Sequence, residues 1–440
     1  MQNIPTKRYP GREKARIFNL LGGLAYRANN LDMARTLLHR AIKIDPTNSE
    51  FYNNLGVVYS AGHRLRKATL AFQNAMTHQP DNIESCRNLG LTLYRRGRIP
   101  EATYIFKRAI SIDPEDAESH LNLGNCHQIS GHQSKARLAY LTAIQFQPDY
   151  TEAYLNLGNL YYREGDTAKS IKLYRKATEM DPRSTRAFHN LALALKAIGN
   201  TQASIKAFET AARLDHKNMS ARHMLAALTG KTTDRAPAQY VRKLFNSYAN
   251  GFERHLMDKL QYRMPSLLNR LVAQLSQKQV VFDKALDLGC GTGLAGEIIR
   301  PVVKELYGVD LSPAMIDIAA AKDIYDHLVI DDIPKFLLKH RRQFDMIIAL
   351  DALVYFGDLR SVFRRIRHRL RKGGFFILST ETSAKKSYAL RSSGRYAHSK
   401  SYIRSLARQN GLKPHITKST VVRKESGRWI RGELYILIGT

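Results

Sequence analysis

The chain has 440 residues, 44% of them hydrophobic and 24% charged, with a single Trp. This length predicts two or three domains of ordinary globular composition, and the lack of any run of eighteen apolar residues predicts no membrane span. The basic, polar start lacks the apolar stretch of a secretory signal, and the three cysteines form neither a disulfide framework nor a paired zinc spacing. A reducing, cytoplasmic location without a metal site is expected.

Lysine and arginine together exceed aspartate and glutamate by 31, and both halves of the chain contribute to this excess. An excess of this size favours an acidic partner or nucleic acid through long-range attraction. A solvated surface in a protein of generally basic composition is an equally good interpretation. Charge alone therefore identifies no ligand.

The first half of the chain has a period of 34 residues, seen in Pro46, Pro80 and Pro114 and in matching columns of glycine and alanine. Each unit predicts two helices, with small residues where the helices approach closely and a proline that ends the second helix. The pattern resembles the tetratricopeptide-repeat (TPR) consensus. It implies an all-α superhelix of six repeats over residues 15–228, ending in a single capping helix, after a basic tail at residues 1–14.

A column of asparagines follows the same 34-residue step, directly before Leu-Gly or Leu-Ala in the first helix of each repeat. Its members are Asn54, Asn88, Asn122, Asn156 and Asn190. The column resembles the asparagine ladder of O-linked N-acetylglucosamine transferase, and a side-chain amide there can donate to and accept from the backbone of an extended peptide. The alternative is that each asparagine bonds its neighbouring helix. The column predicts a peptide-binding groove, and bonding of each asparagine to its neighbouring helix is kept as the alternative.

The periodicity stops after Gly230, and the polar segment 229–239 is expected to link two domains. From Phe282 onward short apolar strands alternate with helices, which predicts a parallel sheet with crossover helices. The last two apolar stretches, HITKSTVVR and GELYILIG, predict an antiparallel pair at one edge. This order resembles the α/β Rossmann-like, seven-stranded class I methyltransferase domain, here residues 240–440, with the aromatic stretch 240–280 as an N-terminal lid.

A glycine-rich turn, D-L-G-C-G-T-G, follows the first predicted strand and contains Asp287, Gly289, Gly291 and Gly293. Glycines at such a turn let the backbone approach a ligand closely, and the helix that follows begins with free N–H groups. Residues 291–296 also satisfy the dinucleotide fingerprint G-x-G-x-x-G. The acid-first order instead resembles the motif of methyltransferases that use S-adenosylmethionine (SAM), so SAM is the expected cofactor rather than a nicotinamide.

The resemblance implies roles for further residues. Asp287 would accept from the methionine amino group of SAM, the three glycines would line its methionine and ribose, and Asp310 would accept the ribose hydroxyls. Helix N-capping is the alternative for the acidic pair 331–332, in which Asp332 is favoured over Asp331. The remaining positions are Leu311 and Met315 beside the adenine, Asp332 and Ile333 near its amino group, and Asp351 beside the transferring methyl.

Methyl transfer from a sulfonium is an in-line displacement that needs positioning more than acid–base help. A base matters only when the nucleophile arrives protonated. Tyr355 and His255 are the catalytic candidates, with Tyr262, Tyr396 and His398 as further possible bases, and each of the five also fits a plain packing role. No Asn/Asp-Pro-Pro-aromatic tetrad and no cysteine follow the fourth predicted strand, which argues against methylation of amide or adenine nitrogen and of cytosine C5.

Nearly the whole chain resembles the TPR-containing predicted methyltransferases of bacteria, which implies a fold and a cofactor but no substrate. One hypothesis is a protein methyltransferase whose substrate is held by the TPR groove, where the basic charge of the chain would favour an acidic partner. A second is a methyltransferase for a small carboxylate or phenol, with the repeats as an anchor to a complex. A third is a scaffold without catalysis. An RNA substrate is suggested only by charge and lacks an aromatic-basic binding motif.

Overall fold

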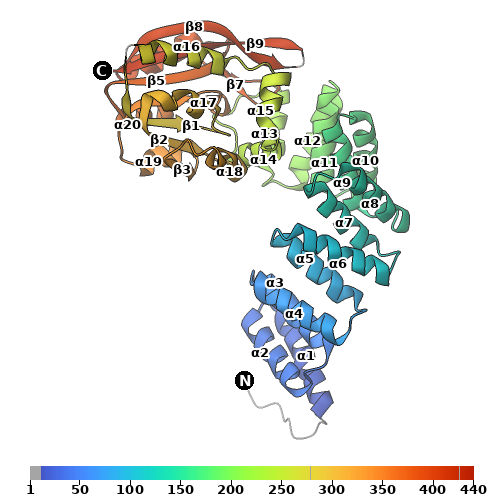
Figure 1. Ribbon diagram of the computed structural model, residues 1–440. Helices are drawn as coiled ribbons and strands as arrows, with labels where there is room; N and C mark the ends of the chain where they lie inside the picture. The colour runs from blue at the N-terminus through green and yellow to red at the C-terminus, as the bar shows by residue number, and fades with distance from the viewer. Residues whose placement is uncertain (1–10, 278, 426) are drawn as a thin grey trace. The chain divides into compact units, whose positions relative to one another are not determined.

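The computed structural model describes residues 11–277, 279–425 and 427–440 (Figure 1). The predicted basic tail lies outside the described residues up to residue 10, and its last four residues belong to the first helix. The described chain divides into two compact units, the first ending at Asn200 and the second beginning at Thr201. Among the described residues, the helices are too short or too polar to cross a bilayer.

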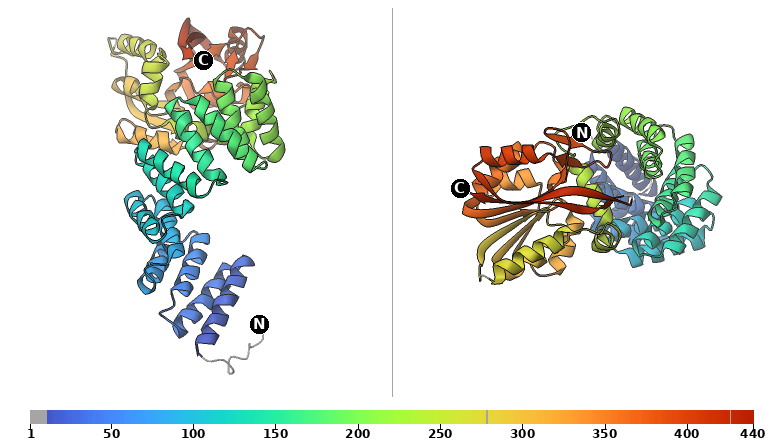
Figure 2. Two further views of the ribbon diagram at one scale, coloured as in Figure 1. Left: turned by 90° about the vertical axis from the view of Figure 1, so that its right-hand side faces the viewer. Right: turned by 90° about the horizontal axis from the view of Figure 1, so that it is seen from above.

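Antiparallel helix pairs, stacked one after another, build the first unit (Figures 1 and 2). Its helices are α1 (Gly11–Arg27), α2 (Leu31–Ile44), α3 (Ser49–Ala61), α4 (Leu65–His78), α5 (Ile83–Arg95), α6 (Ile99–Ile112), α7 (Ala117–Ile129), α8 (Gln133–Phe146), α9 (Thr151–Glu164), α10 (Thr167–Met180) and α11 (Thr185–Ala197). The second unit begins with α12 (Thr201–Leu214) and α13 (Met219–Leu228). By chain order, these thirteen helices are six pairs and a single last helix, which confirms the predicted repeats.

The glycine column explains why the two helices of a pair approach so closely. A Cβ added at Gly56 would lie 2.5 Å from the ring of Phe72, and one at Gly90 would lie 2.6 Å from the ring of Phe106. The following two repeats place tyrosine rings in the same position. Any side chain at these glycines would displace a buried ring, so close packing of the two helices requires glycine at this position. Side-chain oxygens cap many of the helices, for example Asn82, which accepts from the backbone N–H of Ser85.

A mixed sheet forms the centre of the second unit. Five parallel strands have the order β3-β2-β1-β4-β5, β9 runs antiparallel beside β5, and β8 pairs with β9. The bounds are β1 (Phe282–Leu288), β2 (Val303–Asp310), β3 (His327–Ile330), β4 (Phe344–Ala349), β5 (Leu370–Thr382), β8 (Leu412–Glu425) and β9 (Arg428–Gly439). These seven strands are the predicted ones.

Two further short strands were not predicted. β6 (Tyr388–Leu390) and β7 (Tyr396–His398) form a hairpin, and β7 runs parallel to the end of β5, where Glu381 pairs with Ala397. The strand β4 already ends at Ala349. The hairpin therefore extends the sheet beyond the carboxyl end of β4, at the edge where parallel α/β sheets place their ligands.

Helices cover both faces of this sheet, so its strands are apolar along most of their length. One hydrophobic core contains Leu286 and Leu288 of β1 together with side chains of α19, α20 and α21, and the other contains Ala285 with side chains of α16 and α17. The bounds of the remaining helices are α14 (Ala238–Tyr248), α15 (Phe252–Arg254), the π-helical turn η2 (His255–Lys259), α16 (Met264–Gln277), α17 (Leu294–Ile299), η3 (Arg300–Val302), α18 (Pro313–Ala321), α19 (Ile333–Lys339), η4 (Leu353–Tyr355), α20 (Arg360–Arg369) and α21 (Lys400–Gln409).

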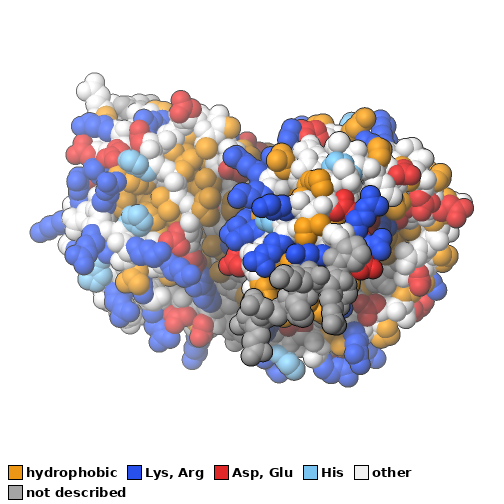
Figure 3. Space-filling model, turned by 90° about the horizontal axis from the view of Figure 1, so that it is seen from below, with side chains coloured by type: hydrophobic (Ala, Val, Ile, Leu, Met, Phe, Trp, Pro, Cys, Tyr) orange, Lys and Arg blue, Asp and Glu red, His pale blue; other side chains and the backbone are white. Residues whose placement is uncertain are grey.

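Basic residues are unevenly divided between these two sets of helices. α19, α20 and α21 contain two, five and three Lys or Arg residues and no Asp or Glu, whereas α16 and α17 contain one Arg and one Glu. Figure 3 shows Lys and Arg side chains scattered over the visible surface, with Asp and Glu between them. Among these five helices, the positive excess therefore lies on the side of α19, α20 and α21.

Candidate active site

The glycine-rich turn between β1 and α17 has a backbone that glycine adopts readily and other residues do not. Gly289, Gly291 and Gly293 have φ angles of +72°, +55° and +93°, in the left-handed region. A Cβ at Gly289 would lie 2.5 Å from the Cβ of Ala352, whereas the nearest atom to a Cβ at Gly291 is a ring carbon of Phe252, 4.0 Å away. The turn is closely packed at Gly289 and open at Gly291.

Asp310 ties this turn to the end of β2. Its carboxylate accepts hydrogen bonds from the backbone N–H of Gly291 at 3.0 Å and of Ser312 at 2.8 Å. Burial raises the pKa of Asp310, and these backbone hydrogen bonds act in the opposite direction. Each carboxylate oxygen keeps a further lone pair, so the side chain can still accept hydroxyl groups of a ligand beside Gly291.

Asp287 is 1% exposed, and its carboxylate accepts a hydrogen bond of 2.8 Å from the hydroxyl of Tyr325. Burial raises the pKa of Asp287 to about 7; the Tyr325 hydrogen bond opposes this rise and the charge of Asp310 adds to it. A cation beside such a buried acid favours its ionised form. Sequence reasoning missed Tyr325, and its only signal was Gly296 and Gly308, where side chains would collide with the Tyr325 ring.

The aromatic segment that precedes α16 is fastened to this turn and to its neighbours. The Ser312 hydroxyl donates to the side-chain oxygen of Asn246 at 2.6 Å, and Lys322 forms an ion pair of 2.6 Å with Glu253. Phe252, as described above, lies beside Gly291. These contacts lay the segment from α14 to α15 along the turn and the β2 end, where a lid over a ligand would have to lie.

At the end of β3, Asp332 is bonded by an arginine of the segment between α13 and α14. Arg235 donates from Nη2 to both carboxylate oxygens of Asp332, at 2.9 and 3.1 Å. The Asp332 side chain makes no capping hydrogen bond to α19, so helix capping does not account for it. Leu311 is half-buried, and Met315 and Ile333 are buried.

A buried ionic cluster lies where β4 and β5 end. Asp351, in the left-handed conformation at φ +55°, binds Arg395 at 2.7 Å and Arg423 at 3.3 Å. Arg423 also binds Glu381 at 2.7 Å, and these two side chains are 2% and 1% exposed. The partly exposed Arg391 and Glu425 extend the cluster, 3.4 Å from Glu381 and 3.5 Å from Arg423. Three positive charges thus face three negative ones, as buried ions require. Sequence analysis predicted only Asp351 among these residues.

Tyr355 lies beside this cluster. The guanidinium carbon of Arg395 is 5.3 Å from the centre of the Tyr355 ring, and the ring of Phe245 meets it edge-on at 5.5 Å. Burial raises the pKa of Tyr355, and burial together with Asp351 raises that of Tyr262 well above its ordinary value. Both phenols are therefore protonated at neutral pH. They are better suited to donate a hydrogen bond to the substrate than to remove a proton from it.

The other candidate bases lie elsewhere. His255 is half-buried at the start of η2, and its ring is 6.0 Å from that of Tyr248. Tyr396 and His398 are fully buried on β7; the Tyr396 hydroxyl is 2.5 Å from that of Thr233, and burial lowers the pKa of His398 to about 4. The packing alternative accounts for Tyr396 and His398.

In the first unit, the asparagine column is bonded from repeat to repeat. Each of four side-chain amides donates to an asparagine of the preceding helix pair: Asn54 to Asn19 at 2.9 Å, Asn88 to Asn53 at 3.0 Å, Asn156 to Asn125 at 2.9 Å and Asn190 to Asn159 at 2.9 Å. Asn122 is buried. The structural alternative is thus present in the column, and each donating amide keeps one N–H and its oxygen for a second partner.

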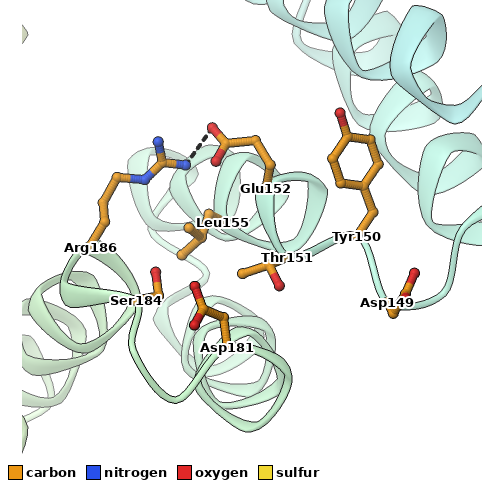
Figure 4. A pocket seen from close by; sticks show the side chains of 8 residues that line it. All are labelled: Asp149, Tyr150, Thr151, Glu152, Leu155, Asp181, Ser184 and Arg186. Atoms are coloured by element: carbon orange, nitrogen blue, oxygen red, sulfur yellow. Dashed lines mark ion pairs between the residues drawn. The ribbon is translucent and has the colours of Figure 1, made fainter. Parts of the chain in front are cut away.

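An open cavity of about 430 Å³ lies where α9 and α11 begin (Figure 4). Leu155 lies at its apolar part, and Tyr150, Asp181 and Ser184 contribute polar groups. Arg186 forms an ion pair of 2.5 Å with Glu152 at its rim. The cavity belongs to the repeats and is separate from the glycine-rich turn.

Family models match both parts of the chain. Residues 260–421 match a methyltransferase domain. Tetratricopeptide-repeat models match residues 37–69, 90–131, 129–165, 158–199 and 185–218. The chain is therefore a TPR protein with a class I methyltransferase domain.

Curated relatives match between 24% and 37% of the chain. The malonyl-[acyl-carrier protein] O-methyltransferase of Priestia megaterium is 26% identical over 32% of this chain and 51% of the relative. A ubiquinone biosynthesis O-methyltransferase of Bradyrhizobium diazoefficiens is 32% identical over 24% and 43%. The mitochondrial arginine-hydroxylase NDUFAF5 of Danio rerio is 27% identical over 37% and 49%. The chain spans about half the length of these relatives, and one of them is named for a reaction other than methylation.

Solved structures match the repeats. The Pseudomonas aeruginosa protein pilF is 20% identical, with a TM-score of 0.44, over 49% of this chain and 99% of its own. PilW, described as a widely conserved type IV pilus biogenesis factor, is 21% identical, with the same TM-score, over 48% and 98%.

Proposed function

We propose that this protein transfers a methyl group from SAM to a protein that its repeats recruit. The observation that carries the proposal is the turn at Gly291, which is open to a ligand while Asp310 holds its backbone and Asp287 lies buried beside it. Bound SAM supplies a methyl group on a positively charged sulfur. The elevated pKa of Asp287, about 7, fits a cationic ligand, because the positive charge would favour the ionised carboxylate.

In this proposal, Asp310 accepts the ribose hydroxyls, the glycines line the methionine and ribose, and Asp287 accepts from the amino group. The remaining cofactor contacts are Leu311 and Met315 beside the adenine, Asp332 and Ile333 near its amino group, and Asp351 near the methyl. Tyr355, protonated and buried, orients the acceptor atom, while Phe252 and the rest of the lid exclude water. His255 remains a candidate base that the lid would bring to the acceptor.

A protein acceptor is the finer part of the proposal. It rests on TPR arrays, which ordinarily bind polypeptides, and on the asparagine column, in which an amide that donates one N–H to its neighbour has a second N–H and an oxygen with which to bond a peptide. The ten Lys and Arg residues of α19, α20 and α21, without an Asp or Glu, would favour an acidic partner. We place this reaction in the cytoplasm, since all three cysteines are free and buried.

Methylation of a small carboxylate or phenol is the second candidate. Two of the relatives described above are named as O-methyltransferases, and they match 32% and 24% of this chain. In that case the repeats anchor the enzyme to a complex and do not present its substrate.

Calorimetric titration with S-adenosylhomocysteine (SAH), the demethylated product of SAM, tests the cofactor. We expect saturable 1:1 binding that Asp310→Asn weakens at least about tenfold, since one hydrogen bond to a charged group contributes roughly 1.5–3 kcal/mol. Asp317→Asn, on the exposed side of α18, is the matched control. A chain that binds no SAH would rule out the proposed function.

Incubation of lysate with methyl-labelled SAM then tests the acceptor. Labelling of a protease-sensitive band supports a protein substrate. Label found only in small metabolites supports the second candidate and contradicts the first. Mass analysis for added oxygen in the same samples checks for hydroxylation, the reaction for which NDUFAF5 is named.

A further inference from the structure

The segment between α13 and α14, expected to be a linker, is bonded to the methyltransferase domain along its length. We call residues 232–236 the strap. The carbonyl oxygen of Asp234 accepts from the backbone N–H of Gly357 and of Asp358, at 2.7 and 2.9 Å. The side chain of Asp234 accepts from the Tyr388 hydroxyl at 2.8 Å. The strap therefore joins the loop after β4 to the β6–β7 hairpin.

Both ends of the proposed site are reached by the strap. The backbone N–H of Ala236 donates to the carbonyl of Tyr355 at 2.9 Å. Arg235, whose guanidinium lies 5.0 Å from the centre of the Phe356 ring, binds Asp332 as described above. The backbone of the candidate acceptor-orienting residue and the acid expected near the adenine are thus both bonded by one short segment.

α13, the last helix of the repeats in chain order, holds the β6–β7 hairpin directly. His223 of α13 is 3% exposed, and its Nε2 lies 2.9 Å from the carbonyl oxygen of Gly394. Gly394 has φ +85°, and a Cβ there would lie 2.8 Å from the hydroxyl of Tyr240 and 3.0 Å from the sulfur of Met224. Close packing and a buried hydrogen bond thus fix the residue that directly precedes Arg395.

Arg395 connects the hairpin held by α13 to the proposed site, since it binds Asp351 and covers the face of Tyr355. We propose that α13 and the strap are a positioning element of the methyl-acceptor site, in which His223 acts through Gly394 and Arg395. This inference rests on the proposed function. In this proposal the last helix of the repeats helps to position the acceptor site of the methyltransferase domain, in addition to the role of the repeats in holding a partner.

The chemistry of His223 fits this role. Only a protonated Nε2 can donate to the Gly394 carbonyl, and Nδ1 is buried without a hydrogen-bond partner. The ring is packed against Tyr240, 4.9 Å away between centroids. A neutral imidazole therefore satisfies the contact. An aliphatic side chain of similar size would fill the space but lose the hydrogen bond to Gly394 of the β6–β7 hairpin.

Three substitutions in the full chain test the inference. His223→Leu removes the donor, and His223→Gln retains a side-chain N–H. Ile366→Val, at a buried position of α20 rather than of the hairpin, is a control that costs about 1 kcal/mol of stability. The measurements are SAH affinity, label transferred from methyl-labelled SAM to the lysate acceptor, and hydrogen exchange of residues 388–398.

We expect His223→Leu to lower methyl transfer about tenfold or more, because small displacements of positioning groups have effects of this size. SAH affinity should change less than twofold, exchange of residues 388–398 should accelerate, and His223→Gln should restore transfer substantially. Ile366→Val should leave transfer unchanged. Equal transfer by His223→Leu and the wild type, or equal losses in His223→Leu and Ile366→Val, would overturn the inference. A wild-type chain that binds no SAH would instead contradict the proposed function, and the exchange data would still report whether His223 fixes the hairpin.

Discussion

Glycine serves opposite purposes in the two units. In the repeats, Gly56 and Gly90 keep helical geometry and make room for a neighbouring ring, whereas Gly289 and Gly293 in the methyltransferase domain adopt positive φ angles. The first role recurs every 34 residues, against a Phe or Tyr ring in four successive repeats, and the second occurs at one turn. Stability in the repeats is therefore divided among similar local contacts, while the site depends on contacts that occur once.

The two units also differ in how they satisfy buried polar groups. The repeats use neutral amides in pairs, such as Asn88 with Asn53. The methyltransferase domain buries charges, most fully Arg423 and Glu381. Because an unpaired buried ion costs far more than an unpaired amide, we expect single substitutions to have larger effects in the second unit.

Removal of α13 by truncation should have the largest effect on stability. A chain that begins at Thr201 retains α13, whereas one that begins at Thr229 loses it, together with the buried Met224 and Ala227 and the His223 contact. We expect the longer chain to fold and bind SAH. The shorter one should unfold about 10 °C lower or aggregate, since the lost contacts contribute several kcal/mol. Thermal unfolding followed by circular dichroism measures both, and equal midpoints would show that α13 is not part of the domain.

Removal of a buried charge should come next. Arg423→Met leaves the buried Glu381 with only its longer ion pair to Arg391, at 3.4 Å, and should lower the free energy of unfolding by about 3 kcal/mol. The control is Arg371→Met, which breaks partly exposed pairs with Asp345 and Asp283 and should cost about 1 kcal/mol or less. Denaturant titration measures the difference. Similar losses in the two variants would contradict the argument that burial makes this ion pair costly to break.

Asp287 gives the comparison a dependence on pH. Its folded-state pKa of about 7 exceeds its ordinary value of 3.8, so the folded state binds the proton more tightly than the unfolded state. This contribution to stability is present below about pH 4 and is lost as the pH rises to 7, by roughly 1.4 kcal/mol per pH unit. Asp287→Asn should flatten the stability profile over this range. An unchanged slope in denaturant titrations at pH 4.5, 5.5 and 6.5 would contradict the burial argument.

Glycine substitutions within the repeats should have the smallest effects. A Cβ at Gly90 meets the ring of Phe106, so Gly90→Ala should destabilise the protein by about 1–3 kcal/mol. Among the described residues outside its own helix turn, no atom lies within 4 Å of a Cβ at Gly23 in α1, and Gly23→Ala should be neutral or stabilise by up to about 1 kcal/mol. Methyl transfer and SAH binding should be the same in both variants at temperatures where they are folded. A loss at Gly23 as large as that at Gly90 would refute the packing explanation.

The repeats and the glycine-rich turn could be predicted because the first follows a regular spacing and the second is a short contiguous motif. The 34-residue period fixes helix pairing, and the sequence D-L-G-C-G-T-G fixes a strand, a turn and a helix start. Arg423 could not be predicted, because its partners Asp351 and Glu381 lie 72 and 42 residues away without any spacing rule. Arg235 was overlooked for another reason: a polar segment with a proline looks like a linker whether or not a domain binds it.

The contact between Arg235 and Asp332 has a thermodynamic consequence for the cofactor. If the adenine amino group donates to Asp332, then the strap and the cofactor share one carboxylate. Each then alters the affinity of the other by the same factor. SAH would bind with a different affinity to Arg235→Met, and cofactor occupancy would in turn change how firmly α13 is held. Binding of the cofactor would thereby be coupled energetically to the last helix of the repeats.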